Sequence, residues 1–365
     1  MQTAGKVDEW NILVGLLPSS WDEKAYSLGA FKRSRYLKTP GAVLRLLLFH
    51  AVNGSGARET VAQAAAAGVA DISSQALHKR MRTSVDWLRW IAEQLAGEFR
   101  DRNRTPEGLR PRLIDSTTVQ GPGSKGTDWR LHYTLDLQTL SCDWHELTDS
   151  RGAERLERTP VQAGDVLLGD RNFLAFDSVR AVVDKEGHVL VRMKWQHPIV
   201  HDAAGQRVEA LSLARGLRVG EVGEWDVSLV GPREGAVPVP GRIVILRKPA
   251  IAAAKAERKA KRKGRSSRYV DKRTIEACHY VMLFTTLRKD ILNARGIMEL
   301  YRYRWQIEIA FKRHKQLLGL GALPHKSKEA SQSWIMAKLI LALLLEKMNR
   351  NAVAFSPWGF DLETA

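Results

Sequence analysis

The sequence predicts an α/β protein with a mixed β-sheet flanked by helices, a β-rich insertion and an all-α N-terminal domain. Three observations predict this class. Helical periodicity fills residues 1 to about 105, strand-like segments begin only after that point, and short strands with Gly and Pro turns occupy residues from about 197 to 248. Because three antiparallel-looking strands are followed by alternating strand and helix, we expect a mixed sheet with helices on its faces.

Residues 1–105 are expected to form a helical DNA-binding domain. Four segments carry helical periodicity between glycines and short polar turns: Ala42 to Val52, Thr60 to Ala67, Ser73 to Arg82 and Val85 to Phe99. A helix-turn-helix needs a small residue, a turn glycine and two apolar contacts, which are supplied in order by Ala64, Gly68, Val69 and Leu77. Its second helix would present Gln75, His78, Lys79 and Arg82 to DNA. The alternative is an ordinary helical hairpin.

Residues 106–196 are expected to supply the first part of the sheet. Strand patterns cover residues 111–119, 128–137, 141–149, 166–170 and 188–195, and a helix from Phe176 to Lys185 fits between the last two. The segment GPGSKG at residues 121–126 matches a glycine-rich dinucleotide-binding pattern, but Pro122 interrupts it and a strand follows where that site needs a helix. We therefore expect a hairpin loop there.

Residues 197–276 are expected to form the β-rich insertion with a basic arm. From Lys255 to Arg273 the chain has ten basic and two acidic residues. Few apolar residues accompany them, so this segment cannot fold alone as a packed unit. It is a disordered insertion, a solvated helix or an arm that follows DNA, and its charge density favours DNA contact through Lys255, Lys259, Lys261 and Arg262. The sheet then resumes in residues 277–350, with a strand at 278–287 and helices after 290, and residues 351–365 form a tail.

The composition indicates a polyanionic partner. The formal net charge is +17 and the isoelectric point is about 10.0, and clustered Lys and Arg gain affinity by displacing counterions from phosphates. Nucleic acid is the first candidate and an anionic membrane is the competitor. The longest apolar run, residues 335–345, is too short to span a bilayer and contains Lys338. The N-terminus has no signal-peptide pattern and two cysteines form no disulfide framework, so a cytoplasmic location is expected.

The stretch YRYRWQIEIAFKRHK, residues 301–315, places a glutamate among aromatic and basic side chains. Read as one helix, it gathers on one face Tyr301, Arg304, Glu308, Lys312 and Lys315. The opposite stripe holds Tyr303, Ile307, Ala310, Phe311 and Leu318, and is wide enough to dock on a core. The polar face is either a solvated surface with an ordinary Arg304–Glu308 pair or part of a functional site.

Two aspartates occupy positions where a charge is costly. Asp115 lies within a strand pattern, and Asp170 ends the apolar strand VLLGD. A buried acid needs a cation or hydrogen-bond donors. Together with Glu308 they make three carboxylates without a nearby His or Cys ligand pattern, which favours Mg²⁺ or Mn²⁺, as one ion or as a two-metal site acting on a phosphodiester. Asp136 and Asp165 are alternates for this site.

These residues resemble the signature of a known family. The spacing Y-x2-R-x3-E-x6-K, met by Tyr301, Arg304, Glu308 and Lys315, is similar to the YREK signature of the insertion-sequence DDE transposases of the hairpin-forming, cut-and-paste kind. IDSTT around Asp115 and GDRNF around Asp170 resemble that family's two aspartate regions, and WRLHYTLDL resembles its second strand. The resemblance covers residues from about 112 to 345. Asn172 departs from the glycine of many relatives, although asparagine tolerates the left-handed region.

The resemblance implies a ribonuclease H-like catalytic core, interrupted by the insertion before the glutamate helix. It implies that Asp115, Asp170 and Glu308 bind two Mg²⁺ or Mn²⁺ ions and catalyse strand cleavage and transfer. It also implies that DNA phosphates contact Tyr301, Arg304 and Lys315. The basic side chains of Lys312 and Arg171, near the acids in the sequence, are expected to contact DNA as well. A tryptophan, Trp195 or Trp225, would receive a base flipped out of the duplex. Two protomers would hold the terminal inverted repeats of a mobile element and join them to target DNA.

Two rival functions share parts of this pattern. A ribonuclease H-like nuclease that cuts without strand transfer would keep the three acids, and an assay for joined or hairpin products separates it from a transposase. A DNA-binding protein derived from a transposase would bind DNA without needing metal. The intact acids and signature favour the enzyme.

Overall fold

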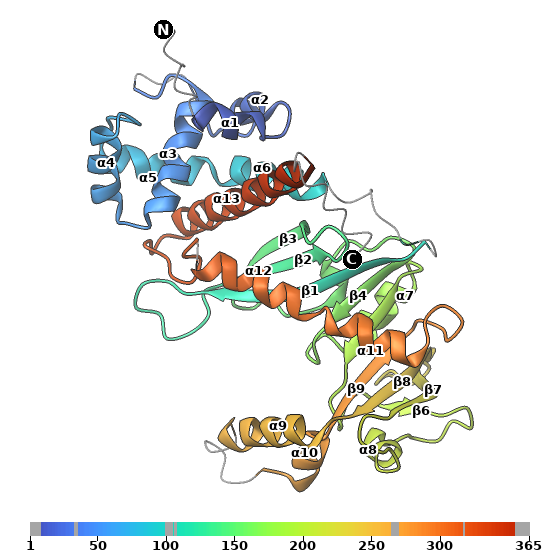
Figure 1. Ribbon diagram of the computed structural model, residues 1–365. Coiled ribbons are helices and arrows are strands. Elements are labelled where there is room, and N and C mark those ends of the chain that lie inside the picture. The colour runs from blue at the N-terminus through green and yellow to red at the C-terminus, as the bar shows by residue number, and fades with distance from the viewer. Residues whose placement is uncertain are drawn as a thin grey trace.

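The computed structural model describes residues 9–32, 36–98, 105, 108–263, 270–316 and 318–354. Within these residues a nine-stranded sheet has the order β3-β2-β1-β4-β5-β9-β8-β7-β6 (Figure 1). Its strands are β1 (Arg110–Val119), β2 (Trp129–Asp136), β3 (Cys142–Asp149), β4 (Asp165–Gly169), β5 (His188–Arg192), β6 (Val200–His201), β7 (Val222–Leu229), β8 (Val239–Arg247) and β9 (Tyr280–Thr285).

The first five strands confirm the predicted ribonuclease H-like arrangement. β2 pairs antiparallel with both β1 and β3, whereas β4 lies parallel to β1, and β5 lies parallel to β4. Every residue of β4 is buried, as expected for a parallel strand covered on both faces. Residues 121–126 connect β1 to β2 as the expected hairpin loop.

The strands of the predicted insertion continue the same sheet. β9 pairs antiparallel with β5 on one side and with β8 on the other, so Thr285 lies opposite both Leu190 and Arg242. β8 therefore runs parallel to β5 and β4. Helix α9 (Ala250–Lys263), which follows β8, consequently leaves the sheet at the end where the segments after β4 and β5 also leave it.

The N-terminal helices follow local capping signals. They are α1 (Glu9–Gly15), α2 (Trp21–Ser27), α3 (Pro40–Asn53), α4 (Ala57–Ala66), α5 (Ser74–Thr83) and α6 (Val85–Gly97). In α3 the Thr39 hydroxyl accepts a hydrogen bond from the Ala42 N–H at 3.2 Å, Pro40 occupies the first turn, and Gly54 adopts φ +64° after the last residue. Cap, proline and left-handed glycine fix both ends of the helix.

The remaining helices lie on or beside the sheet. They are α7 (Phe176–Val183), α8 (Ala210–Ala214), α10 (Lys272–Ala277), α11 (Ala294–Arg302), α12 (Trp305–Gln316) and α13 (Lys328–Ala354), with a 3₁₀ turn at Leu156–Arg158. Helix α12 crosses the face of the sheet beside β1 (Figure 1). This placement brings α12 over the strand that carries Asp115.

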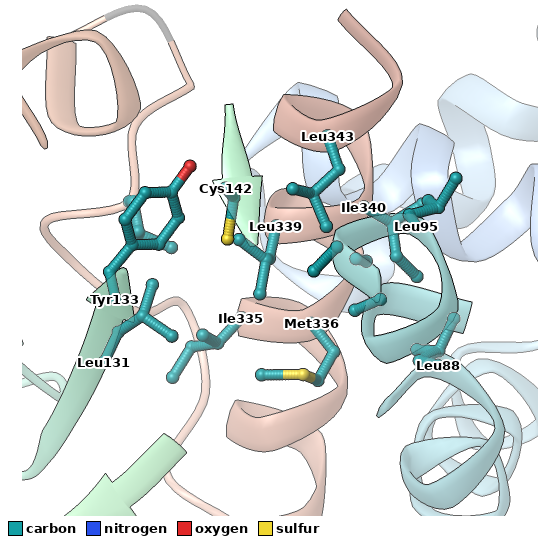
Figure 2. Packing of buried hydrophobic residues seen from close by; sticks show 14 of the residues in the cluster. Leu88, Leu95, Leu131, Tyr133, Cys142, Ile335, Met336, Leu339, Ile340 and Leu343 are labelled. Atoms are coloured by element: carbon teal, nitrogen blue, oxygen red, sulfur yellow. The ribbon is translucent and has the colours of Figure 1, made fainter. Parts of the chain in front are cut away.

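Helix α13 lies between the sheet and the N-terminal helices (Figure 1). Ile335 and Leu339 lie beside Leu131 of β2, and Ile340 of the same helix lies beside Leu95 of α6 (Figure 2). The N-terminal helices and the sheet therefore share one hydrophobic core through α13. None of the described helices combines the length and the apolar character needed to cross a membrane.

The prediction of one helix across residues 301–315 is wrong. Helix α11 ends at Arg302 and α12 begins at Trp305, because the N–H groups of Tyr303 and Arg304 bond to the carbonyls three residues earlier, at 3.2 and 3.1 Å. Such bonds tighten and close a last helical turn. The expected apolar stripe holds at Ile307, Ala310 and Phe311, but Tyr303 is 52% exposed.

Candidate active site

Asp115 and Asp170 reach the same level of the sheet on neighbouring strands. β1 and β4 are parallel, and Leu113 pairs with Leu168, so the residues two positions further along each chain lie side by side. Both aspartates are half-buried. The charge of Asp170 is one cause of the raised pKa of Asp115, which agrees with their proximity.

Each aspartate is held by a backbone donor from its own segment. The Ser116 N–H donates to Asp115 Oδ1 at 2.7 Å, and the Asn172 N–H donates to Asp170 Oδ1 at 2.7 Å. These bonds fix the orientation of both carboxylates. Asn172 is not among the described residues with positive φ, so its departure from glycine causes no backbone strain.

Arg304 lies between Glu308 and Asp115. Its Nη2 donates to Glu308 Oε1, and its Nη1 lies 4.0 Å from Asp115 Oδ2. The Glu308 side chain is 59% exposed, so it lies at the rim of the site. The Tyr301 hydroxyl donates to the Gly169 carbonyl at 3.3 Å, directly before Asp170. The turn between α11 and α12 thereby ties the glutamate helix to the ends of β1 and β4.

The electrostatics of the site favour binding of a cation. Burial raises the pKa of Asp115 to about 6, the charges of Asp170 and Glu154 raise it as well, and the Ser116 bond and Arg304 lower it. Burial also raises the pKa of Tyr301 to about 12, so its hydroxyl stays protonated and can donate to Gly169. Burial and the neighbouring carboxylates therefore disfavour the charged form of Asp115, and a bound cation would stabilise that form.

The acids fit a hard cation in their chemistry. Asp115, Asp170 and Glu308 offer oxygen ligands alone, which suits Mg²⁺ or Mn²⁺. In the part of the chain that the structure describes, no three His, Cys, Asp or Glu side chains lie close enough together to hold a metal ion. Glu308 bonds to Arg304 instead, and Arg304 also faces Asp115.

Exposed basic side chains surround these acids. Lys312 and Lys315 lie on α12, and Arg171 follows Asp170, all three exposed. Sequence reasoning placed Tyr303 on the apolar stripe and did not consider Trp305, whereas both side chains, on either side of Arg304, are exposed, at 52% and 50%. Their exposure depends on the turn between α11 and α12, which no glycine or proline signals.

Sequence reasoning also missed Glu154, which lies between β3 and the 3₁₀ turn. Its Oε1 accepts a hydrogen bond from Ser116 Oγ at 2.6 Å, and its Oε2 accepts one from Asn172 Nδ2 at 3.4 Å. Arg130 of β2 pairs with it at 3.4 Å. The surrounding letters SRGAERLE carry no motif. Only the folded chain brings this loop to the aspartates.

The choice of Asp136 and Asp165 as alternates is wrong. Both belong to a buried ion network in which Arg110 Nε lies 2.8 Å from Asp136 and Arg112 Nη1 lies 2.8 Å from Asp165. Alternate residues of a strand face opposite sides of the sheet. Arg112 and Asp115 are three residues apart on β1, so the network and the candidate site lie on opposite faces.

The two candidate tryptophans have different surroundings. Trp195 follows β5, its Nε1 donates to Thr274 Oγ1 at 3.2 Å, and the Arg273 guanidinium lies 4.5 Å from the ring centroid. It lines a cavity of about 340 Å³. The Trp225 ring packs on Gly223, where an added Cβ would come within 2.3 Å of it. Trp225 therefore serves packing of β7, whereas Trp195 borders open space.

The N-terminal helices differ from the predicted helix-turn-helix. Ala64 and Leu77 are buried and Gly68 has φ +66°, as such a motif requires. However, α4 ends at Ala66 and α5 begins at Ser74, so the connection is longer than the three or four residues typical of that motif. The side chains on α5 are nevertheless exposed at Gln75, His78, Lys79 and Arg82.

The basic arm is helical over its described part. Lys255, Lys259, Lys261 and Arg262 are exposed on α9. Glu257 bonds to His279 Nε2 at 2.6 Å and holds the helix beside β9. Residues 264–269 of the predicted arm lie outside the described residues.

Comparison with known proteins agrees with this geometry. The family described as "Transposase DDE domain" matches residues 106–345. The chain is 34% identical over 356 residues to "Putative transposase InsL for insertion sequence element IS186A" of Escherichia coli K12, covering 96% of each chain. It is also 34% identical over 357 residues to "Transposase for insertion sequence element IS421" of Escherichia coli, again covering 96% of each.

A solved structure is also similar, namely the piggyBac transposase synaptic complex with hairpin DNA. The TM-score is 0.49 at 10% sequence identity, covering 95% of this chain and 73% of that one. The family match and the two relatives extend across the sheet and the segments that carry all three acids. The chain therefore belongs to the DDE transposase family, enzymes that cleave and transfer DNA strands.

Proposed function

We propose that this chain binds the ends of its own mobile element and performs cut-and-paste transposition with Asp115, Asp170 and Glu308 as its catalytic acids. Hydrolysis would free a 3′ hydroxyl at the element's end, and that hydroxyl would attack the opposite strand or the target DNA. The proposal rests on the register of the parallel strands β1 and β4, which places Asp115 beside Asp170, and on Arg304, which lies between Asp115 and Glu308.

The family match implies dependence on a divalent metal. We propose that the three acids hold Mg²⁺ or Mn²⁺, in a two-ion site. Such ions, when bound, activate the attacking oxygen and stabilise the leaving oxygen at a phosphodiester. The protein's own part is to orient the carboxylates through the Ser116 and Asn172 N–H groups, and to fix the end of β4 through Tyr301.

The basic side chains around the acids would hold the DNA strand. Lys312, Lys315 and Arg171 are exposed. The Arg304 guanidinium lies between the carboxylates of Asp115 and Glu308. Phosphate contacts of this kind position a strand without reading its sequence. Tyr301 would add a phosphate contact by turning its hydroxyl proton from the Gly169 carbonyl to a phosphate oxygen when DNA is bound.

Two further surfaces would extend the DNA contact. Helix α9 leaves the sheet at the same end as Asp170, so Lys255, Lys259, Lys261 and Arg262 can follow the duplex away from the cleavage point. At the other end of the molecule, α5 would contact the terminal inverted repeat through Gln75, His78, Lys79 and Arg82. Acting on chromosomal DNA, the protein would work in the cytoplasm at the nucleoid, and a homodimer would hold the two ends.

Trp195 is the better candidate to stack on a flipped base. It leaves β5 at the same end of the sheet as Asp170 and borders a cavity. Trp225 is packed on Gly223 instead. Stacking on Trp195 would offset part of the cost of unstacking the base.

The test is cleavage of end DNA with Mg²⁺ by Asp115→Ala, Asp170→Ala and Glu308→Ala. Each variant should lose cleavage and retain end binding, while Asp226→Ala, an exposed acid on β7 that pairs with Lys289, should behave as wild type. A variant that cuts at the wild-type rate shows that its residue is not needed. Joined or hairpin products distinguish strand transfer from simple hydrolysis.

A further inference from the structure

We propose that Glu154 is a positioning residue for the transposition reaction, because it fixes the two segments that hold Asp115 and Asp170. The proposal rests on the catalytic role proposed above for those aspartates. The Glu154 carboxylate accepts hydrogen bonds from the side chains of Ser116 and Asn172 and forms an ion pair with Arg130. The two hydrogen-bond donors belong to the residues whose N–H groups hold the aspartates.

The bond to Ser116 controls Asp115. Ser116 directly follows Asp115 on β1 and uses its N–H to hold Asp115 Oδ1 at 2.7 Å. Its hydroxyl donates to Glu154 Oε1 at 2.6 Å, a short distance typical of a hydroxyl that donates to a charged carboxylate. Ser116 thus bonds to Asp115 through its backbone and to Glu154 through its side chain. Because Ser116 joins the two acids, a movement of Glu154 would displace Asp115.

The bond to Asn172 does the same for Asp170. The Asn172 N–H holds Asp170 Oδ1 at 2.7 Å, and its side-chain amide donates to Glu154 Oε2 at 3.4 Å. A glycine at this position would keep the backbone bond but lose the side-chain one. Asn172 does not adopt positive φ, so its backbone conformation does not require glycine. What asparagine contributes beyond glycine is the side-chain hydrogen bond to Glu154.

Arg130 pairs with the Glu154 carboxylate and holds it in place. The pair is 3.4 Å apart, and the two side chains are 21% and 22% exposed, so the attraction is partly screened by water. A carboxylate accepts bonds at both oxygens, and here one oxygen serves each aspartate segment. Glu154 thus joins β1 to the segment after β4 at the point where the two aspartates lie side by side.

The experiment compares Glu154→Ala and Glu154→Gln with Glu146→Gln in the full-length protein. Glu146 on β3 is a matched control, since it pairs with Arg158 at 2.8 Å and is also partly exposed. We measure the dissociation constant for end DNA, the single-turnover cleavage rate on bound ends, and the Mn²⁺ concentration that gives half the maximal rate. The rise in melting temperature that Mn²⁺ causes without DNA reports metal binding independently of turnover.

For Glu154→Ala we expect cleavage to slow and the Mn²⁺ requirement to rise by about 10- to 100-fold, as for other residues that orient metal-binding side chains. End binding should stay within about twofold of wild type, because no phosphate contact is lost. The rise in melting temperature with Mn²⁺ should shrink. Glu154→Gln keeps an acceptor for Ser116 and should fall between the alanine variant and wild type, while Glu146→Gln should match wild type.

A double-mutant cycle with Asn172→Gly tests the proposed route. Asn172→Gly alone should slow cleavage less than Glu154→Ala does, and it should add little in the Glu154→Ala background, since residues that act together are not additive. If Glu154→Ala cleaves at the wild-type rate with the wild-type Mn²⁺ requirement, while Asp115→Ala is inactive, the role proposed for Glu154 is wrong and the proposed function stands. Normal cleavage by Asp115→Ala would overturn the proposed function and this role with it.

Discussion

Two groups of acids lie on the two faces of the sheet at β1, and they differ in how closely they are paired with arginines and in how deeply they are buried. On one face, Arg110 and Arg112 pair with Asp136, Asp143 and Asp165 at distances from 2.6 to 2.8 Å, and every side chain in the network is at most 2% exposed. On the other face, Asp115 has a single cation nearby, Arg304, at 4.0 Å, within the described part of the chain.

The difference separates a structural role from a chemical one. The buried network places two guanidinium groups among three carboxylates at hydrogen-bonding distance and is closed to solvent, so it fixes β1 against β2, β3 and β4. The candidate site is half-open, and burial together with neighbouring acids raises the pKa of Asp115 to about 6. Acids whose pKa is raised by burial and by neighbouring carboxylates are typical of sites that act on a ligand. Four variants would break or sharpen this comparison.

The largest expected effect comes from Arg112→Met. It leaves Asp143 and Asp165 without the guanidinium that bonds to both, and removing one partner of a buried ion pair costs about 3–5 kcal/mol. Urea denaturation should show this loss in the free energy of unfolding, while the cleavage rate per folded molecule stays near wild type. Loss of cleavage without loss of stability would show that the buried network takes part in the reaction. The distinction between a structural and a catalytic group of acids would then be wrong.

Asp165→Asn should have a smaller effect in the same direction. The amide keeps the size of the side chain but weakens the 2.8 Å bond to Arg112, and a weakened buried hydrogen bond to a charged group costs about 1–3 kcal/mol. Thermal unfolding should show a lower melting temperature with cleavage retained. Inactivity at normal stability would restore Asp165 as a catalytic candidate.

Asp115→Asn is expected to change stability in the opposite direction. The folded-state pKa is raised from 3.8 to about 6, so the native state favours the protonated acid, and that contribution to stability is present below pH 3.8 and lost as the pH rises through 6. The neutral amide should therefore raise the free energy of unfolding at pH 7 by about 1–3 kcal/mol. Denaturation at pH 4 and pH 7 should show the gain at the higher pH, with cleavage lost at both.

Arg304→Gln should have the smallest effect on stability. Its pair with Glu308 is an i, i+4 pair with a 59% exposed acid, and such surface pairs contribute at most about 1 kcal/mol. Cleavage should nevertheless fall steeply, because the residue links the glutamate helix to Asp115 and would contact phosphate. A stable variant with normal cleavage and end binding would show that Arg304 has no part in the reaction or in DNA binding.

Much of the fold could be predicted from local signals. The strands β1 to β5 have patterns of alternating or continuous apolar residues, and the caps of α3 are visible as Thr39, Pro40 and Gly54. The three candidate acids could also be predicted from the sequence, because the family signature is defined by the spacing of residues along the chain. The break at Tyr303 and Arg304 could not be predicted, since the bonds that close α11 leave no glycine or proline in the sequence.

The sequence by itself determined the succession of helices and strands along the chain, the basic character of the protein and the choice of Asp115, Asp170 and Glu308 as candidates, because these depend on periodicity, composition and spacing. The tertiary structure alone decided that β6 to β9 extend the same sheet, that α13 joins the N-terminal helices to it, and which acids are neighbours. Strand register places Asp136 and Asp165 against arginines and brings Glu154 to Ser116 and Asn172. Such contacts join residues far apart in the chain, and no local pattern encodes them.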